Sequence, residues 1–150
     1  MQKEKNMNKE QIRLNFINAC RGNLFEEVDS ILTSYLKEND NFSCVVFDQA
    51  FINCVLDENI KAMQYLISNT TLKVSPMSYS YLFDKADEKP ELIKFLCFNL
   101  PDVQELQNIC DFHIHKSNDF MNECLKSRIE KDLFSMVLEQ KEQGAVKFKI

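Results

Sequence analysis

Cys110, His113, His115 and Cys124 are the residues whose types and spacing come closest to a chemical site. Zinc in proteins takes about four ligands in a tetrahedral arrangement, most often Cys and His. Cys110 and His113 are one helical turn apart, but His115 lies roughly 200° further around a helix than His113, and no second Cys/His pair has zinc-finger spacing. One interpretation is a metal-dependent regulator or small helical enzyme that uses Cys110, His113 and Cys124. The other, which we favour, is an ordinary helix with a partly buried His113, an exposed His115 and no cofactor or metal.

Signatures of other catalytic sites are weak in this sequence. A Cys nucleophile needs an oriented base and an oxyanion hole, and no Gly-rich turn marks one beside any of the six Cys. Gly22 and Gly144 stand too far apart to form a phosphate-binding loop. The carboxylate pairs Glu26-Glu27 and Asp87-Glu88 are expected at helix starts, where negative charge favours the helix dipole. We therefore expect a protein without catalytic activity.

Tyr79 and Tyr81 are the candidate partner-binding residues. Together with Phe83 they form an aromatic run in a predicted helix that cannot bury all three on one face. Exposed aromatic side chains are enriched in the parts of protein interfaces that contribute most binding energy. The alternative is that both Tyr side chains fill the groove between neighbouring helical hairpins.

Composition excludes several other classes of protein. The 150 residues carry a net charge of −5, which speaks against nucleic acid as a partner because phosphates attract basic surfaces. No stretch approaches the roughly 18 apolar residues of a membrane span. The six Cys form no CxxC pair and fall mostly in apolar stripes, which indicates reduced thiols and a cytoplasmic location. We expect a monomer that binds another protein.

Apolar residues recur at helical spacing along almost the whole chain, with only two Gly and three Pro to interrupt them. The pattern predicts an all-α fold of four stacked antiparallel helical hairpins and a C-terminal capping helix. A flexible segment, 1–9, precedes the single domain, 10–143, and Gly144 is expected to end the last helix. The tail, 144–150, alternates with period two and could form a strand or trail. The nine helices are expected at about 10–21, 24–36, 43–54, 59–67, 77–86, 89–99, 103–113, 118–125 and 131–143.

A short motif returns within this pattern, since Phe16-Ile17-Asn18 recurs as Phe51-Ile52-Asn53 after 35 residues. Periods of about 20–50 residues are typical of stacked helical repeats. Each copy is followed by the same apolar frame: Phe25, Val28, Ile31 and Leu32, then Ile60, Met63, Leu66 and Ile67, and more faintly Pro90, Ile93, Leu96 and Cys97.

These frames resemble the second helix of ankyrin repeats, and Ser75-Pro76-Met77-Ser78 is similar to that family's Thr-Pro-Leu-His helix start. The resemblance covers about three units, roughly residues 10–100. It implies a non-catalytic module that binds another protein through its inner helices and hairpin tips. Such small ankyrin-like proteins are frequent among bacterial and viral effectors delivered into a host cell. A generic array of helical hairpins has the same apolar period, and a subunit of a larger assembly, with an apolar exposed end, is a further alternative.

Overall fold

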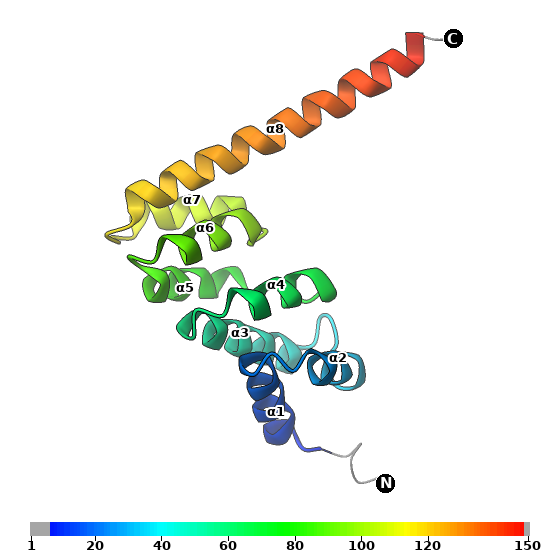
Figure 1. The fold of residues 1–150 in the computed structure, drawn as a ribbon, viewed down its shortest axis with the longest axis vertical. Helices are drawn as coiled ribbons and strands as arrows, with labels where there is room; N and C mark the ends of the chain where they lie inside the picture. The colour runs from blue at the N-terminus through cyan, green and yellow to red at the C-terminus, as the bar shows by residue number, and fades with distance from the viewer. Residues whose placement is uncertain (1–6, 149–150) are drawn as a thin grey trace.

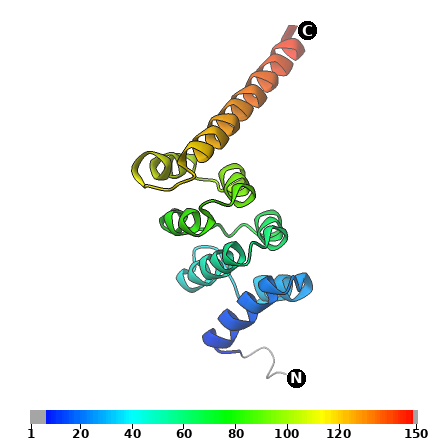
Figure 2. The same ribbon diagram turned by 60° about the vertical axis from the view of Figure 1, so that its left-hand side comes forward.

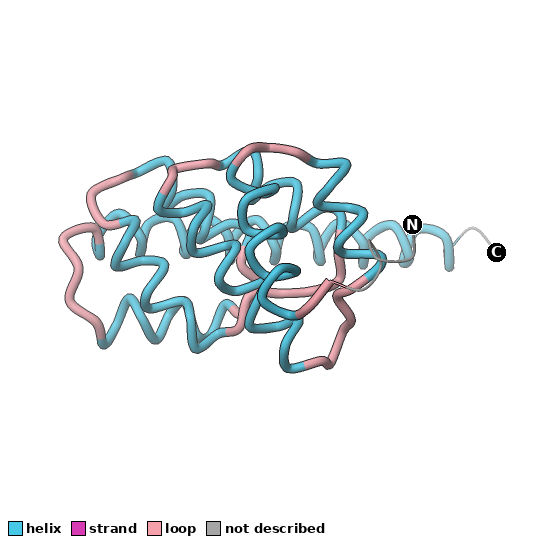
Figure 3. Tube along the Cα trace, turned by 90° about the horizontal axis from the view of Figure 1, so that it is seen from below, coloured by secondary structure: helices cyan, strands magenta, loops and turns pink. Residues whose placement is uncertain are grey.

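The computed structural model describes residues 7–148, with side chains to residue 141, and contains no strand within that range (Figures 1 and 3). It confirms the predicted all-α fold class. No helix among these residues combines the length and apolar content that crossing a membrane requires. The helices are α1 (Lys9–Arg21), α2 (Phe25–Ser34), α3 (Asn41–Leu56), α4 (Ile60–Asn69), the short 3-10 helix η2 (Pro76–Ser78), α5 (Tyr79–Ala86), α6 (Pro90–Asn99), α7 (Val103–Phe112) and α8 (Asn118–Phe148).

Consecutive helices pair, and the pairs lie above one another along the long axis of the molecule (Figures 1 and 2). Helix α3 packs on α1, α5 packs on α3, and α7 packs on α5, so the first helices of the pairs form one continuous row. The second helices α2, α4 and α6 lie beside them, and the beginning of α8 covers α6 and α7. The core runs through this stack and includes fully buried Phe16, Phe47, Phe51, Leu82, Leu96 and Leu106.

The turns inside the first two hairpins are built alike. In each, the second turn residue has a left-handed backbone, with φ of 57° at Asn23 and 55° at Glu58. Gly22 has φ −91° and is the C-cap of α1, so Asn23 takes the left-handed position of the first turn. Asn visits the left-handed region more readily than most residues.

Contacts between these two hairpins join residues 36 positions apart. The Arg21 guanidinium pairs with the Asp57 carboxylate, with Nε 2.7 Å from Oδ2, and Asn59 Nδ2 donates to Asn23 Oδ1 at 2.9 Å. The same offset separates Arg13 from Gln49 and Asp29 from Tyr65, whose side chains are also hydrogen-bonded. Several polar contacts therefore fix how the second hairpin sits on the first.

The C-terminal region differs from the prediction, because one helix, α8, replaces the two expected at 118–125 and 131–143. Residues 126–130 contain no Gly or Pro and include good helix formers, so nothing in them breaks the helix. Gly144 lies inside α8, where Gly costs about 1 kcal/mol relative to Ala but does not by itself end a helix. The predicted strand or trailing tail at 144–150 is therefore wrong for residues 144–148, and residues 149–150 lie outside the described part.

The predicted flexible segment 1–9 is only partly described, since residues 1–6 lie outside the description. Lys9 begins α1, and Asn8 caps it by accepting the Gln11 N–H at 2.8 Å. The Gln11 side chain accepts the Asn8 N–H in return, which completes a capping box. Helix α1 therefore begins at Lys9, one residue before the predicted start of the domain.

Candidate functional site

Helix α8 divides into a packed beginning and a projecting remainder (Figure 1). Met121, Cys124 and Leu125 are buried against the stack. Arg128 then closes the packed part, because its Nη1 donates to the carbonyl oxygens of Cys97, at 2.8 Å, and of Leu100. These two carbonyls belong to the C-terminal end of α6, which lacks further helical donors. Arg128 therefore fixes the place and the direction in which α8 leaves the stack.

Beyond this point the helix packs on nothing in the described part of the chain, and every residue of 129–141 is exposed. Six of these residues are large and apolar, with exposed fractions between 39% and 64%. Their spacing of three, four and seven residues places them on one broad face of the helix. We call this face the α8 apolar stripe: Ile129, Leu133, Phe134, Met136, Val137 and Leu138.

The opposite face of the same segment is polar. Arg128, Asp132, Ser135 and Glu139 follow one another at intervals of four, three and four residues, which keeps them on one side of a helix. The Arg128 and Asp132 side chains form an ion pair along this side, with Nε 3.9 Å from Oδ2. The projecting helix is thus amphipathic, although none of the described residues covers its apolar face.

The two candidate aromatic residues have different surroundings. Tyr79 is fully buried, and its hydroxyl oxygen accepts the N–H of Asp102 at 3.2 Å. Burial also raises the pKa of the Tyr79 hydroxyl. Tyr79 is therefore a core residue, and the prediction that it contacts a partner is wrong. Tyr81 is 46% exposed, and the Lys85 ammonium lies 5.0 Å from its ring centroid in a cation–π contact.

The Cys and His residues of the alternative metal-site interpretation do not share one environment. Helix α7 ends at Phe112, so His113 lies beyond the helix and is exposed, with its Nδ1 3.3 Å from Ser80 Oγ. His115 is less exposed than His113, which is the reverse of our prediction. Because α7 ends at Phe112, the helical spacing on which that prediction rested does not apply to either His. Cys110 is half-buried and Cys124 is buried. Within the described residues, no three His, Cys, Asp or Glu side chains gather as a metal site.

The buried thiols are poorly suited to nucleophilic chemistry. Burial raises the pKa of Cys97, Cys110 and Cys124 above the ordinary thiol value. The hydrogen bond between the Cys54 and Cys20 thiols and burial both raise the pKa of Cys54. Because the thiolate is the reactive form, a raised pKa keeps these side chains protonated and unreactive near neutral pH.

Asp87 and Glu88 join the third hairpin to the loop before α8 and do not begin a helix. The Asp87 carboxylate accepts the N–H groups of Lys116, at 3.1 Å, and Ser117, at 3.0 Å, while Glu88 N–H donates to Ser117 Oγ at 2.8 Å. Burial opposes the charged carboxylate, but the hydrogen bonds from Ser117 and Lys116 outweigh it and lower the pKa of Asp87. This carboxylate therefore has a structural task in holding the loop 113–117.

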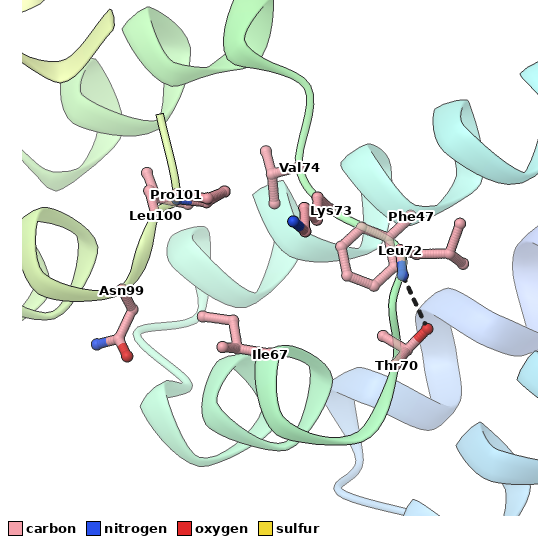
Figure 4. Close-up of a pocket in the computed structure, with 9 residues that line it drawn as sticks. All are labelled: Phe47, Ile67, Thr70, Leu72, Lys73, Val74, Asn99, Leu100 and Pro101. Carbon is pink, nitrogen blue, oxygen red and sulfur yellow. Dashed lines mark hydrogen bonds between the residues drawn. The ribbon is translucent and has the colours of Figure 1, made fainter. Parts of the chain in front are cut away.

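A cavity of about 170 Å³ lies between α3, α4 and the links that follow α4 and α6 (Figure 4). It is smaller than the roughly 300–1,000 Å³ of typical small-molecule sites. Its lining holds no carboxylate, His or Cys side chain, and Lys73 is the only titratable side chain among its lining residues, so the cavity lacks a paired acid and base. The lining residues are Phe47, Ile67, Thr70, Leu72, Lys73, Val74, Asn99, Leu100 and Pro101.

The sequence predicted a separate C-terminal capping helix at 131–143, whereas this segment is the projecting part of α8. The sequence signal for one long helix is that 126–130 contains no Gly or Pro. The helix can therefore continue beyond the helices on which its beginning packs. Comparison with known proteins gives no further guide, because no family model, no curated protein and no solved structure matches this chain significantly.

Proposed function

We propose that this protein is a non-catalytic protein-binding module and that the α8 apolar stripe is its main binding surface. The observation that carries the proposal is the solvent exposure of six large apolar side chains on one face of a projecting helix. Contiguous apolar patches of several hundred square ångströms are uncommon on monomeric soluble proteins and mark interaction sites. An amphipathic helix that lays such a face against a partner is a recurrent mode of protein recognition.

The energetics of the projecting segment favour a bound state. A helical segment without tertiary contacts lacks the packing that supplies most helical stability in proteins. Covering a side chain such as Leu133 or Phe134 stabilises a complex by about 1.5–3 kcal/mol when burial is complete. A partner would therefore order the helix and remove the apolar stripe from water at the same time.

The stack supplies a rigid base for this helix. Polar contacts such as Arg21–Asp57 hold successive hairpins together, and Arg128 fixes the exit of α8. We further propose that the hairpins have an ankyrin-like arrangement, which the matching turns at Asn23 and Glu58 support. Tyr81, exposed on α5, is proposed as a second and smaller contact for a partner.

Site-specific photo-crosslinking tests this function. A photoreactive phenylalanine replaces Phe134 on the stripe or, as the matched control, Ser135 on the polar face, and both variants are crosslinked in lysate of the source cell. We expect a discrete protein adduct from position 134 that disappears when Leu133→Glu is added, and no adduct from position 135. Equal adducts from both positions, or none from 134 in a variant with native helix content, would exclude the stripe as a binding surface.

A further inference from the structure

We propose that the partner of the α8 apolar stripe is a second copy of this chain and that two α8 helices pair antiparallel. This inference rests on the proposed function, because it names the occupant of the same surface. It draws on three properties of the projecting segment: its apolar area, the order of its charges along one face, and the distribution of charge between helix and stack.

The area of the stripe suits a dimer. Leu133, Phe134, Val137 and Leu138 are the four stripe residues that would lie against a paired helix. They are 45–64% exposed and leave on the order of 100 Å² each in water, or about 400 Å² per copy. Two copies would bury about 800 Å² together, which is the size of a weak and reversible interface.

The order of residues along the helix makes two copies complementary to each other when they lie antiparallel. Glu130, Phe134, Val137 and Lys141 follow at intervals of four, three and four, the spacing of a coiled-coil seam. In an antiparallel pair, Phe134 meets Val137 of the second copy and Glu130 meets Lys141 of the second copy, twice by symmetry. A parallel pair in register would place Glu130 beside Glu130 and Lys141 beside Lys141, which is repulsive.

Leu133 and Leu138 flank this seam on its two sides. In an antiparallel pair each flank faces the same flank of the second copy, so the two Leu133 side chains line one side of the seam and the two Leu138 side chains line the other. The antiparallel seam therefore has an apolar centre with an oppositely charged pair at each end. Such an arrangement gives both affinity and a single orientation.

The charge of the whole molecule favours the same orientation. Residues 126–141 hold four basic and three acidic residues, so the projecting segment is nearly neutral and the excess acid of the −5 chain lies elsewhere. Two like-charged stacks repel each other when they are close. An antiparallel pair holds the stacks at opposite ends of the helix pair, whereas a parallel pair would bring them side by side.

Sedimentation velocity of the purified full chain over a wide concentration range tests the proposal. We expect a reversible dimer that Val137→Asp weakens at least about a hundredfold, because it places a charge in the apolar seam. The matched control Ser135→Asp, on the polar face, should leave the dimerisation constant unchanged. A chain that stays monomeric at every concentration would overturn the second-copy proposal, and the face-specific adduct at Phe134 with another protein would then still support the binding function.

Charge reversal tests the orientation independently of folding. Glu130→Lys and Lys141→Glu should each weaken the dimer roughly fivefold, because each creates two like-charge contacts. The double variant restores both opposite-charge contacts and should restore the wild-type constant. Single reversals without effect, or a double variant as weak as the singles, would overturn the antiparallel pairing, and far-UV circular dichroism verifies that every variant keeps its helix content.

Discussion

The hairpin stack and the projecting part of α8 are built from the same kind of amphipathic helix but end in opposite situations. In the stack, each apolar face meets the next helix, as the contacts of α3 with α1, α4 and α5 show. In the projecting part, residues 129–141 carry an equally apolar face that nothing in the described chain covers. Helical periodicity therefore specifies an apolar face, but whether that face is buried depends on whether another helix lies next to it.

The largest difference between the regions should appear when one apolar side chain is removed from each. Phe51→Ala in the core should lower the free energy of unfolding by about 3–5 kcal/mol, because it leaves a cavity at a fully buried position. Leu133→Ala on the stripe should change it by less than about 0.5 kcal/mol in the monomeric protein. Urea unfolding followed by circular dichroism measures both.

If Phe51→Ala fails to fold, Phe51→Leu gives the same comparison with a smaller loss of about 1 kcal/mol. A Leu133→Ala variant as destabilised as the core variant would mean that the stripe packs on its own chain, which contradicts the projecting arrangement of α8.

Arg128 attaches α8 to the stack at the point where the projecting part begins, so its removal tests that attachment. Arg128→Ala removes the donors to the Cys97 and Leu100 carbonyls and should cost about 1–3 kcal/mol of unfolding free energy. The neighbouring exposed cation gives the control, since Lys131→Ala should cost less than about 0.5 kcal/mol. Equal effects in thermal unfolding would show that Arg128 does not fasten α8 to α6.

Tyr79 and Tyr81 allow the same comparison within one helix, because one lies in the core and the other on the surface. Tyr79→Phe deletes the hydroxyl that accepts the Asp102 N–H and should cost about 1 kcal/mol. Tyr81→Phe keeps the aromatic ring beneath Lys85 and should leave unfolding unchanged. Chemical denaturation distinguishes the pair, and a larger effect at Tyr81 would reverse our assignment of core and surface.

The smallest effect on stability should be seen at low pH, where Asp87 becomes protonated. Asp87 links the third hairpin to the loop before α8. Asp87 has a lowered pKa in the folded state, so its stabilising contribution is present above the ordinary Asp pKa of about 4 and is lost as the pH falls through the folded value. Asp87→Asn should therefore lose less stability than the wild type on acidification. Unfolding midpoints measured as a function of pH check this, with Asp84→Asn as an exposed control expected to follow the wild type.

How much of this could be predicted from sequence differs between residues. The first four helices and the helix start at Pro90 follow from apolar spacing and from the preference of Pro for a first helical turn. The burial of Tyr79 was also readable, because Tyr79, Leu82, Phe83 and Ala86 share one helical face. We gave this burial only as the alternative, because we treated Tyr79, Tyr81 and Phe83 as one aromatic group.

Other features depend on three-dimensional context that a pattern does not contain. The environments of His113 and His115 follow from the end of α7 at Phe112, and that end is set by the loop bonded to Asp87 from another hairpin. The exposure of Leu133 and Phe134 follows from the length of α8 relative to the helices beneath it. Periodicity gives the same pattern whether or not a neighbouring helix is present.

The fastening of α8 at Arg128 has a mechanical consequence. The 20 residues from 129 to 148 form a lever about 30 Å long, since a helix rises 1.5 Å per residue. A rotation of about 10° about the point where α8 leaves the stack would move its free end by about 5 Å, which is close to the spacing of neighbouring side chains on a helix. The stiffness of the Arg128 contact and of the packing of Met121, Cys124 and Leu125 would thus govern how far the projecting helix can rotate relative to the stack.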